Sequence, residues 1–140
     1  MASLLMTIQP ILKAYADALN SILKMEISIT DENLIRVAGT NRHMSQQMAR
    51  SVDVQKESGI MKYAMEMRQP VIVDNPMEHS ACAGCRAKEI CREQYNISIP
   101  ILVDDTVLGG IALIAVNKRQ RDRMEKIESN TRNLSSILLV

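Results

Sequence analysis

The sequence predicts an α+β fold in which an antiparallel sheet packs against helices from both ends of the chain. Apolar residues recur at helical spacing near the amino terminus and again near the carboxy terminus. Between them, pairs of segments with alternating polarity are joined by short polar turns, which is the pattern of β-hairpins. The 140 residues match the size of one domain, so we expect residues 1–140 to form a single domain.

The composition excludes several classes of protein. With 46% apolar and 24% charged residues the chain is not a disordered polymer, and no apolar run reaches the roughly 20 residues that cross a bilayer. No basic region precedes the apolar start, so we expect a cytoplasmic protein without membrane association. A net charge of +1 does not provide the excess of basic residues that is typical of direct nucleic-acid binding. The absence of Phe and Trp disfavours large planar chromophores as ligands.

The first third of the chain predicts a helix and a hairpin. Apolar residues between Leu4 and Leu23 fall on one helical face. The segment 25–30 alternates apolar and polar residues like a half-buried strand, and segment 34–38 is its return strand. A short polar helix is expected over about residues 42–50.

The middle of the chain predicts a second helix and a second hairpin. Apolar residues share one side of a helix over 59–67, which Pro70 stops before a short strand at 71–73. Tyr95, Ile97, Ile99 and Ile101 alternate with polar residues or proline, and segment 107–116 returns after a turn at Asp104-Asp105. That turn accounts for the two neighbouring carboxylates without a functional role.

The last segment, 118–140, predicts a helix that pairs with another helix. Its apolar and small residues recur at steps of three and four, which makes two heptad repeats: Met124, Ile127, Thr131, Leu134 and Leu138. The basic run at 118–123 lies among acidic residues and is expected to be a solvated face. The chain ends on apolar residues without a capping signal, so we expect the natural protein to continue into an output domain.

Two stretches carry a resemblance to the GAF family. Segment 59–73 (GIMKYAMEMRQPVIV) resembles that family's helix, Pro-containing turn and strand, and segment 99–115 (IPILVDDTVLGGIALIA) resembles its hairpin. The chain is more narrowly similar to the GAF-like N-terminal sensory domains of bacterial enhancer-binding, sigma-54-dependent transcriptional regulators. The resemblance implies a sheet of about six strands, terminal helices packed on one face, a ligand pocket between the sheet and the mid-chain loop, and a homodimer through the terminal helices. Arg119 follows Asn117-Lys118 where the family's cyclic-nucleotide signature has Phe, so cyclic nucleotides are not the expected ligand.

Residues 74 to about 92 show no sustained period and make a connection long enough to suggest a functional loop. Cys82 and Cys85 place two thiols on one turn, Cys91 can return a third ligand, and His79 can complete a set for zinc or an iron-sulfur cluster. Two alternatives stay open, namely a thiol switch that forms a disulfide on oxidation and a loop whose cysteines have no special role. Asp74, Glu78 and His79 could contact a polar small-molecule effector.

Three functions fit these features. The first is a sensor without enzymatic activity, in which an effector, metal or cluster at the loop biases the terminal helices. The second is a thiol-based enzyme, because His79-Ser80-Ala81-Cys82 is similar to a segment of GAF-fold free methionine sulfoxide reductases. Residues 1–81 lack the further cysteines of those enzymes, which favours the sensor. The third is a dimerisation module without a ligand.

Overall fold

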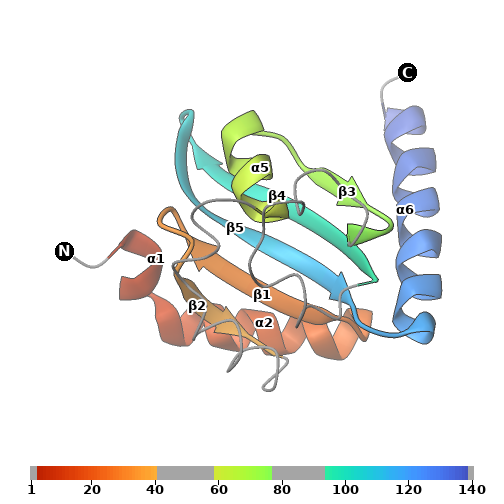
Figure 1. Ribbon diagram of the computed structural model, residues 1–140, viewed down its shortest axis with the longest axis horizontal. Helices are drawn as coiled ribbons and strands as arrows, with labels where there is room; N and C mark the ends of the chain where they lie inside the picture. Colours follow the sequence, from red (N-terminus) through yellow and green to blue (C-terminus); the bar gives the residue numbers. More distant parts are fainter. Residues whose placement is uncertain (1–2, 41–58, 77–93, 139–140) are drawn as a thin grey trace.

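The computed structural model describes residues 3–40, 59–76 and 94–138, with side chains described to Ser129 in the last helix. In this part of the chain, five strands form one antiparallel sheet in the order β2-β1-β5-β4-β3 (Figure 1). The predicted α+β class is confirmed, with five described strands where about six were expected. The helices and strands are α1 (Leu4–Thr7), α2 (Gln9–Leu23), β1 (Glu26–Asp31), β2 (Arg36–Gly39), α5 (Ile60–Met67), β3 (Val71–Val73), β4 (Tyr95–Val103), β5 (Thr106–Ala115) and α6 (Lys118–Leu138).

The amino-terminal helical segment is divided into two helices, where the sequence predicted one. α1 begins at Ser3, whose Oγ accepts a hydrogen bond from the amide of Met6 at 3.2 Å. Pro10 then lies in the first turn of α2. Proline has no amide hydrogen to continue the hydrogen bonds of a preceding helix but fits the start of a new one, which explains the break at Ile8.

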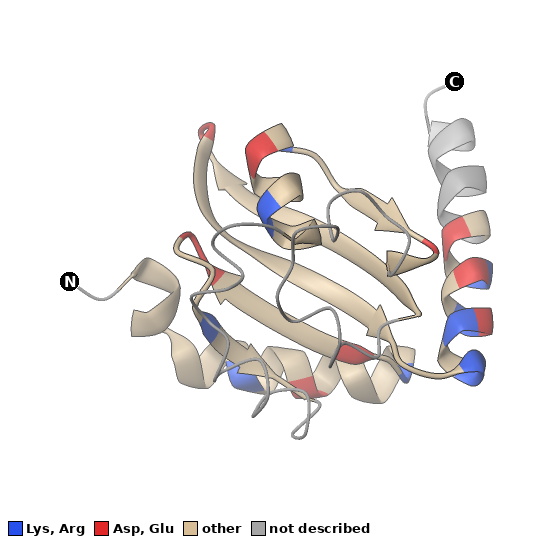
Figure 2. Cartoon of the chain, in the orientation of Figure 1, with Lys and Arg blue, Asp and Glu red and all other residues tan. Residues whose placement is uncertain are grey.

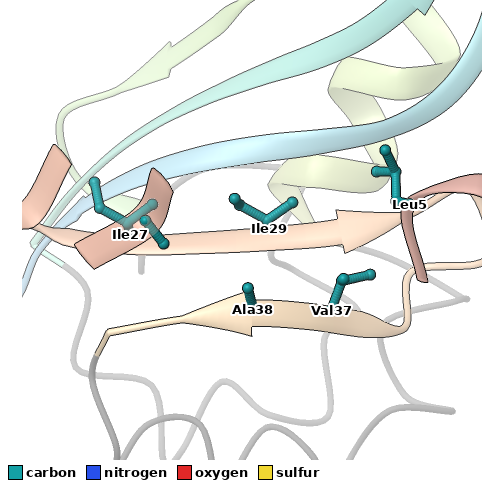
Figure 3. Close-up of a cluster of buried hydrophobic side chains, with 6 residues drawn as sticks. Leu5, Ile27, Ile29, Val37 and Ala38 are labelled. Atoms are coloured by element: carbon teal, nitrogen blue, oxygen red, sulfur yellow. The ribbon is translucent and has the colours of Figure 1, made fainter. Parts of the chain in front are cut away.

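One face of the sheet carries the main apolar core. Ile27 and Ile29 of β1 are buried there with Val37 and Ala38 of β2 and Leu5 of α1, as Figure 3 shows. Residues of α2 complete this cluster, together with partly buried residues of β4 and β5. Each fully buried Ile or Leu contributes about 1.5–3 kcal/mol of transfer free energy, so this face supplies a large share of the fold's stability.

The carboxy-terminal helix packs on the same face. Met124 of α6 is fully buried with Met25, Tyr95 and Ala115, and Leu113 of β5 contacts both this cluster and the main core. The expectation that the terminal helices share one face of the sheet is therefore confirmed. Figure 1 shows α6 beside the end of the sheet at which β4 begins.

The opposite face of the sheet is contacted by α5, which lies in front of β4 and β5 in Figure 1. Two neighbouring glycines of β5 allow helices to approach the strand from both sides. A Cβ at Gly109 would lie 2.5 Å from Cδ1 of Leu5 in α1, and a Cβ at Gly110 would lie 2.1 Å from Sδ of Met61 in α5. Since successive residues of a strand face opposite ways, these contacts place α1 and α5 on different faces.

The two edges of the described sheet are short. β2 has four residues and β3 has three. Side chains of α2 occupy backbone acceptors of β2, because Gln9 Nε2 donates to the carbonyl of Val37 at 2.7 Å and Lys13 Nζ donates to that of Gly39 at 2.9 Å. These hydrogen bonds use groups that an added strand would need.

The turns of both hairpins agree with the sequence. Asp31 Oδ1 accepts hydrogen bonds from the amides of Asn33 and Ile35, which closes the β1–β2 connection. Asp104 and Asp105 both have positive φ, as a two-residue hairpin turn requires, so their assignment to turn chemistry is confirmed. The helix expected at 42–50 lies outside the described residues. In the described part of the chain, no helix is long and apolar enough to cross a membrane.

Candidate functional site

Four polar residues of two strands lie on the sheet face that α5 contacts. Ser28 and Thr30 come from β1, and Asn96 and Ser98 come from β4; we call this set the polar face. The strand register places Ser28, Ala112 and Ser98 in one row across β1, β5 and β4. Thr30 pairs with Gly110 in the next row, beside Pro100. Side chains paired across antiparallel strands project from the same face, so the four polar groups project together.

Three of these side chains are buried to an extent unusual for polar groups. Ser98 is 0% exposed, Asn96 5% and Thr30 6%. Ser98 Oγ donates a hydrogen bond to Oδ1 of Asn96 at 2.6 Å. Among the described residues, Thr30 Oγ1 is the buried side-chain oxygen or nitrogen with no hydrogen-bond partner. Leaving such a group unpaired in a buried position costs about 1–3 kcal/mol of stability.

In the described part of the chain, the central strands of this face carry no charged side chain on it. β3, β4 and β5 contain no Asp, Glu, Lys or Arg, and Figure 2 shows most of the described charged residues on helices and turns. Glu26 lies in the end row, where its Oε2 accepts a hydrogen bond from Thr40 at 3.0 Å. On β2, the Arg36 guanidinium folds back over Gly39, where a Cβ would lie 1.7 Å from its Nη2. The centre of the polar face therefore offers neutral hydroxyl and amide groups.

The residues predicted from sequence as ligand contacts are mostly outside the described part. Asp74 follows β3 and is exposed, while Glu78, His79, Cys82, Cys85 and Cys91 all fall in residues 77–93. The pairing of Val73 with Asn96 brings the end of β3 beside the start of β4, where Asn96 of the polar face lies. Within residues 3–40, 59–76 and 94–138, no group of three His, Cys, Asp or Glu side chains could hold a metal ion.

Sequence reasoning did not single out the polar face. Its members occupy the polar positions of alternating strands, and such positions are normally solvated. The sequence did contain a signal for burial. The polar positions in the centres of β1 and β4 are Ser, Thr and Asn, and none of them is one of the charged residues that are typical of an exposed face.

Comparisons with known proteins agree with this architecture. The family described as "Stage V sporulation protein T C-terminal, transcription factor" matches residues 8–139. The protein of Escherichia coli (strain K12) that carries the name uric acid sigma-54-dependent transcriptional regulator UacR is 32% identical over 144 residues. The match covers 98% of this chain and 23% of that protein, so the chain spans about a quarter of the relative's length.

Solved structures with similar folds are GAF domains and a GAF-fold enzyme. The GAF domain of a phosphoenolpyruvate-protein phosphotransferase from Coxiella burnetii has a TM-score of 0.60 at 13% identity, covering 91% of this chain and 86% of that one. A type II free methionine-R-sulfoxide reductase from Thermoplasma acidophilum has a TM-score of 0.56 at 12% identity, covering 86% of each chain. At such identities these matches describe the fold and do not separate sensor from reductase. On the family match and the shared architecture together, the chain belongs to the Stage V sporulation protein T C-terminal family and has the GAF fold that its sequence resembles.

Proposed function

We propose that this chain is the sensory domain of a longer transcriptional regulator and that a small-molecule effector binds on its polar face. The relative of 32% identity bears the name of such a regulator, and its greater length leaves room for an output domain. We assign the chain no catalytic step, because the relative of 32% identity is named as a regulator and residues 1–81 contain no cysteine.

The unpaired hydroxyl of Thr30 is the observation that carries this proposal. It is buried beside Gly110, and Met61 of α5 lies on that glycine. A ligand atom that forms a hydrogen bond with this hydroxyl removes the free-energy cost of the unsatisfied group. The removal of that cost contributes to the free energy of ligand binding. Ser98 of β4 lies two strands from Thr30 across the sheet and can serve a second polar edge of the same ligand, with Asn96 hydrogen-bonded behind it.

The chemistry of the polar face favours a compact ligand rich in carbonyl and N–H groups. Neutral hydroxyl and amide groups pair with such edges, whereas a polyphosphate would require several cations. The relative's name refers to uric acid, a small heterocycle of this description, so urate is the first compound to test. Arg36 at the border of the face suits a ligand that carries one negative charge.

A Thr30→Val substitution tests this proposal. Valine keeps a similar shape without the hydroxyl, so we expect the ligand-free domain to gain about 1 kcal/mol of unfolding free energy. Loss of one hydrogen bond should weaken urate binding about fivefold to tenfold in calorimetry. Thr106→Val is the matched control, because Thr106 is exposed at the start of β5. Equal urate affinity in both variants contradicts the assignment of Thr30 to the effector site.

We propose in addition that Cys82, Cys85 and Cys91, with His79, hold a zinc ion or an iron-sulfur cluster. The support is their spacing in the sequence and the thiolate preference of these metals. A bound metal would then restrain the segment that joins β3 to β4. A thiol switch at the same three cysteines is the alternative, and metal analysis distinguishes the two.

We also propose that the domain forms a homodimer through its terminal helices. Four large apolar residues stay exposed on α1 and α2, with exposed fractions of 57% for Leu4, 66% for Ile11, 54% for Tyr15 and 73% for Ile22. The three on α2, Ile11, Tyr15 and Ile22, are separated by four and seven residues, which places them on one side of α2 at the spacing of a coiled-coil seam. A second copy presents the same stripe and is a complementary partner in a two-fold dimer.

A further inference from the structure

The first residues of β4 take part in both the polar face and the attachment of α6. Asn96 and Ser98 belong to the polar face, whereas Tyr95 and Ile97 contact the buried cluster around Met124 of α6. Because successive side chains of a strand project to opposite faces, one short stretch of backbone serves both surfaces. A displacement of Asn96 therefore also displaces Tyr95.

Two hydrogen bonds fasten α6 to this stretch. The Tyr95 hydroxyl donates to the Glu128 carboxylate, and Arg121 Nη1 donates to the carbonyl of Gln94 at 3.1 Å. Tyr95 is 2% exposed, so its ring is fixed by packing and its hydroxyl is presented at a defined point along α6. Hydrogen bonds to a charged acceptor are stronger than those between neutral groups.

The first turn of α6 also has contacts with residues outside β4. Gln120 Oε1 accepts from the amide of Val116 at 2.9 Å, and its Nε2 donates to Glu26 Oε1 at 3.3 Å. Glu128 follows Gln120 by eight residues, about 12 Å further along the helix axis. The helix is thus anchored at its base, and the Tyr95 contact sets the direction of the part above it.

We propose that Tyr95 is the positioning residue through which occupancy of the polar face changes the orientation of α6 about its anchor at Gln120. This inference rests on the proposed function, because it assigns a regulatory consequence to the same effector site. Ligand contact at Asn96 and Ser98 moves the start of β4, and the Tyr95–Glu128 hydrogen bond transfers that movement to the helix. The helix then has two orientations, and the ligand selects one of them.

The test compares Tyr95→Phe with Tyr15→Phe, which removes the same hydroxyl from an exposed position on α2. Urate binding is measured by calorimetry, and backbone hydrogen exchange is measured over residues 118–138. We expect both variants to bind urate within about threefold of wild type, since neither changes the polar face. In wild type and Tyr15→Phe, urate should change α6 exchange, whereas in Tyr95→Phe less than half of that change should remain. An undiminished change in Tyr95→Phe overturns the inference.

A second arm needs no ligand and keeps the two proposals distinguishable. Ala112→Val enlarges a side chain between Ser28 and Ser98 and so perturbs the polar face directly. Introduced into the wild-type chain, it should change α6 exchange about threefold or more, and combined with Tyr95→Phe it should cause a change less than half as large. Equal changes with and without Tyr95→Phe overturn the role of Tyr95, even if urate does not bind. Absence of urate binding to wild type counts against urate as effector and leaves this arm decisive.

Discussion

Replacement of Gly109 by alanine should be among the most damaging single-methyl changes in the domain. The new Cβ would lie 2.2 Å from the carbonyl oxygen of Thr30 and 2.5 Å from Cδ1 of Leu5. The oxygen belongs to the backbone of β1, which pairs with β5 and cannot rotate away, and φ of Gly109 is +154°. Overpacking costs about 1–3 kcal/mol and a disfavoured backbone conformation another 1–3 kcal/mol, so we expect a loss of about 4 kcal/mol.

The neighbouring glycine provides a matched control. A Cβ at Gly110 would lie 2.1 Å from Sδ of Met61, the flexible end of a side chain that can move aside. Alanine also reduces the conformational freedom of the unfolded chain by about 0.4–1 kcal/mol, which offsets part of the cost. We therefore expect Gly110→Ala to change the unfolding free energy by less than about 1.5 kcal/mol.

Urea unfolding followed by far-UV circular dichroism measures both variants, at one protein concentration because dimerisation would shift the midpoint. With a slope of about 2 kcal/mol per molar urea, a loss of 4 kcal/mol lowers the midpoint by about 2 M. The total stability of such a domain is about 5–15 kcal/mol, so Gly109→Ala should remain measurable but weakly folded. Urea midpoints of the two variants within about 0.3 M of each other would refute the reasoning. The backbone of β1 would then move away from the new Cβ at as little cost in free energy as the Met61 side chain.

Two further predictions follow from the proposed assembly and metal site. Ile11→Asp combined with Ile22→Asp should convert a dimer into a monomer in analytical ultracentrifugation, whereas Val103→Asp, at an exposed apolar residue on β4, should leave it dimeric. Anaerobically purified protein should contain stoichiometric zinc or iron, and single serine substitutions should lower that content at least tenfold by loss of a thiolate ligand. No metal in the wild type directs attention to a thiol switch at the same residues, Cys82, Cys85 and Cys91.

The sequence was sufficient for the architecture because its elements carry local signals. Alternation predicted β1, β4 and β5, and the acidic turns at 31–33 and 104–105 adopt the backbone that their side chains favour. The division between α1 and α2 was missed because apolar spacing continues through it. Pro10 was the available signal, since proline is common in the first turn of a helix and destabilising in its interior.

The polar face was harder to find for a physical reason. Whether a serine or threonine on a strand is solvated or buried depends on what covers that face, and this is decided by contacts distant in the chain. Ser98 and Thr30 are 68 residues apart in sequence and come within two strands only through the insertion of β5 between β1 and β4. The cysteine spacing, by contrast, is local and visible in sequence, but spacing alone does not select between a metal and a thiol switch.

The α2 side chains that occupy the β2 edge bear on how such domains can be combined with others. A sensor that is joined to further modules, or that meets its own copies at high concentration, risks strand exchange wherever a sheet edge is free. Gln9 and Lys13 take up acceptors of β2, and the opposite edge strand has only three residues. If the natural protein has further domains, we expect them to contact helix surfaces, where contacts can form and separate without unravelling the sheet.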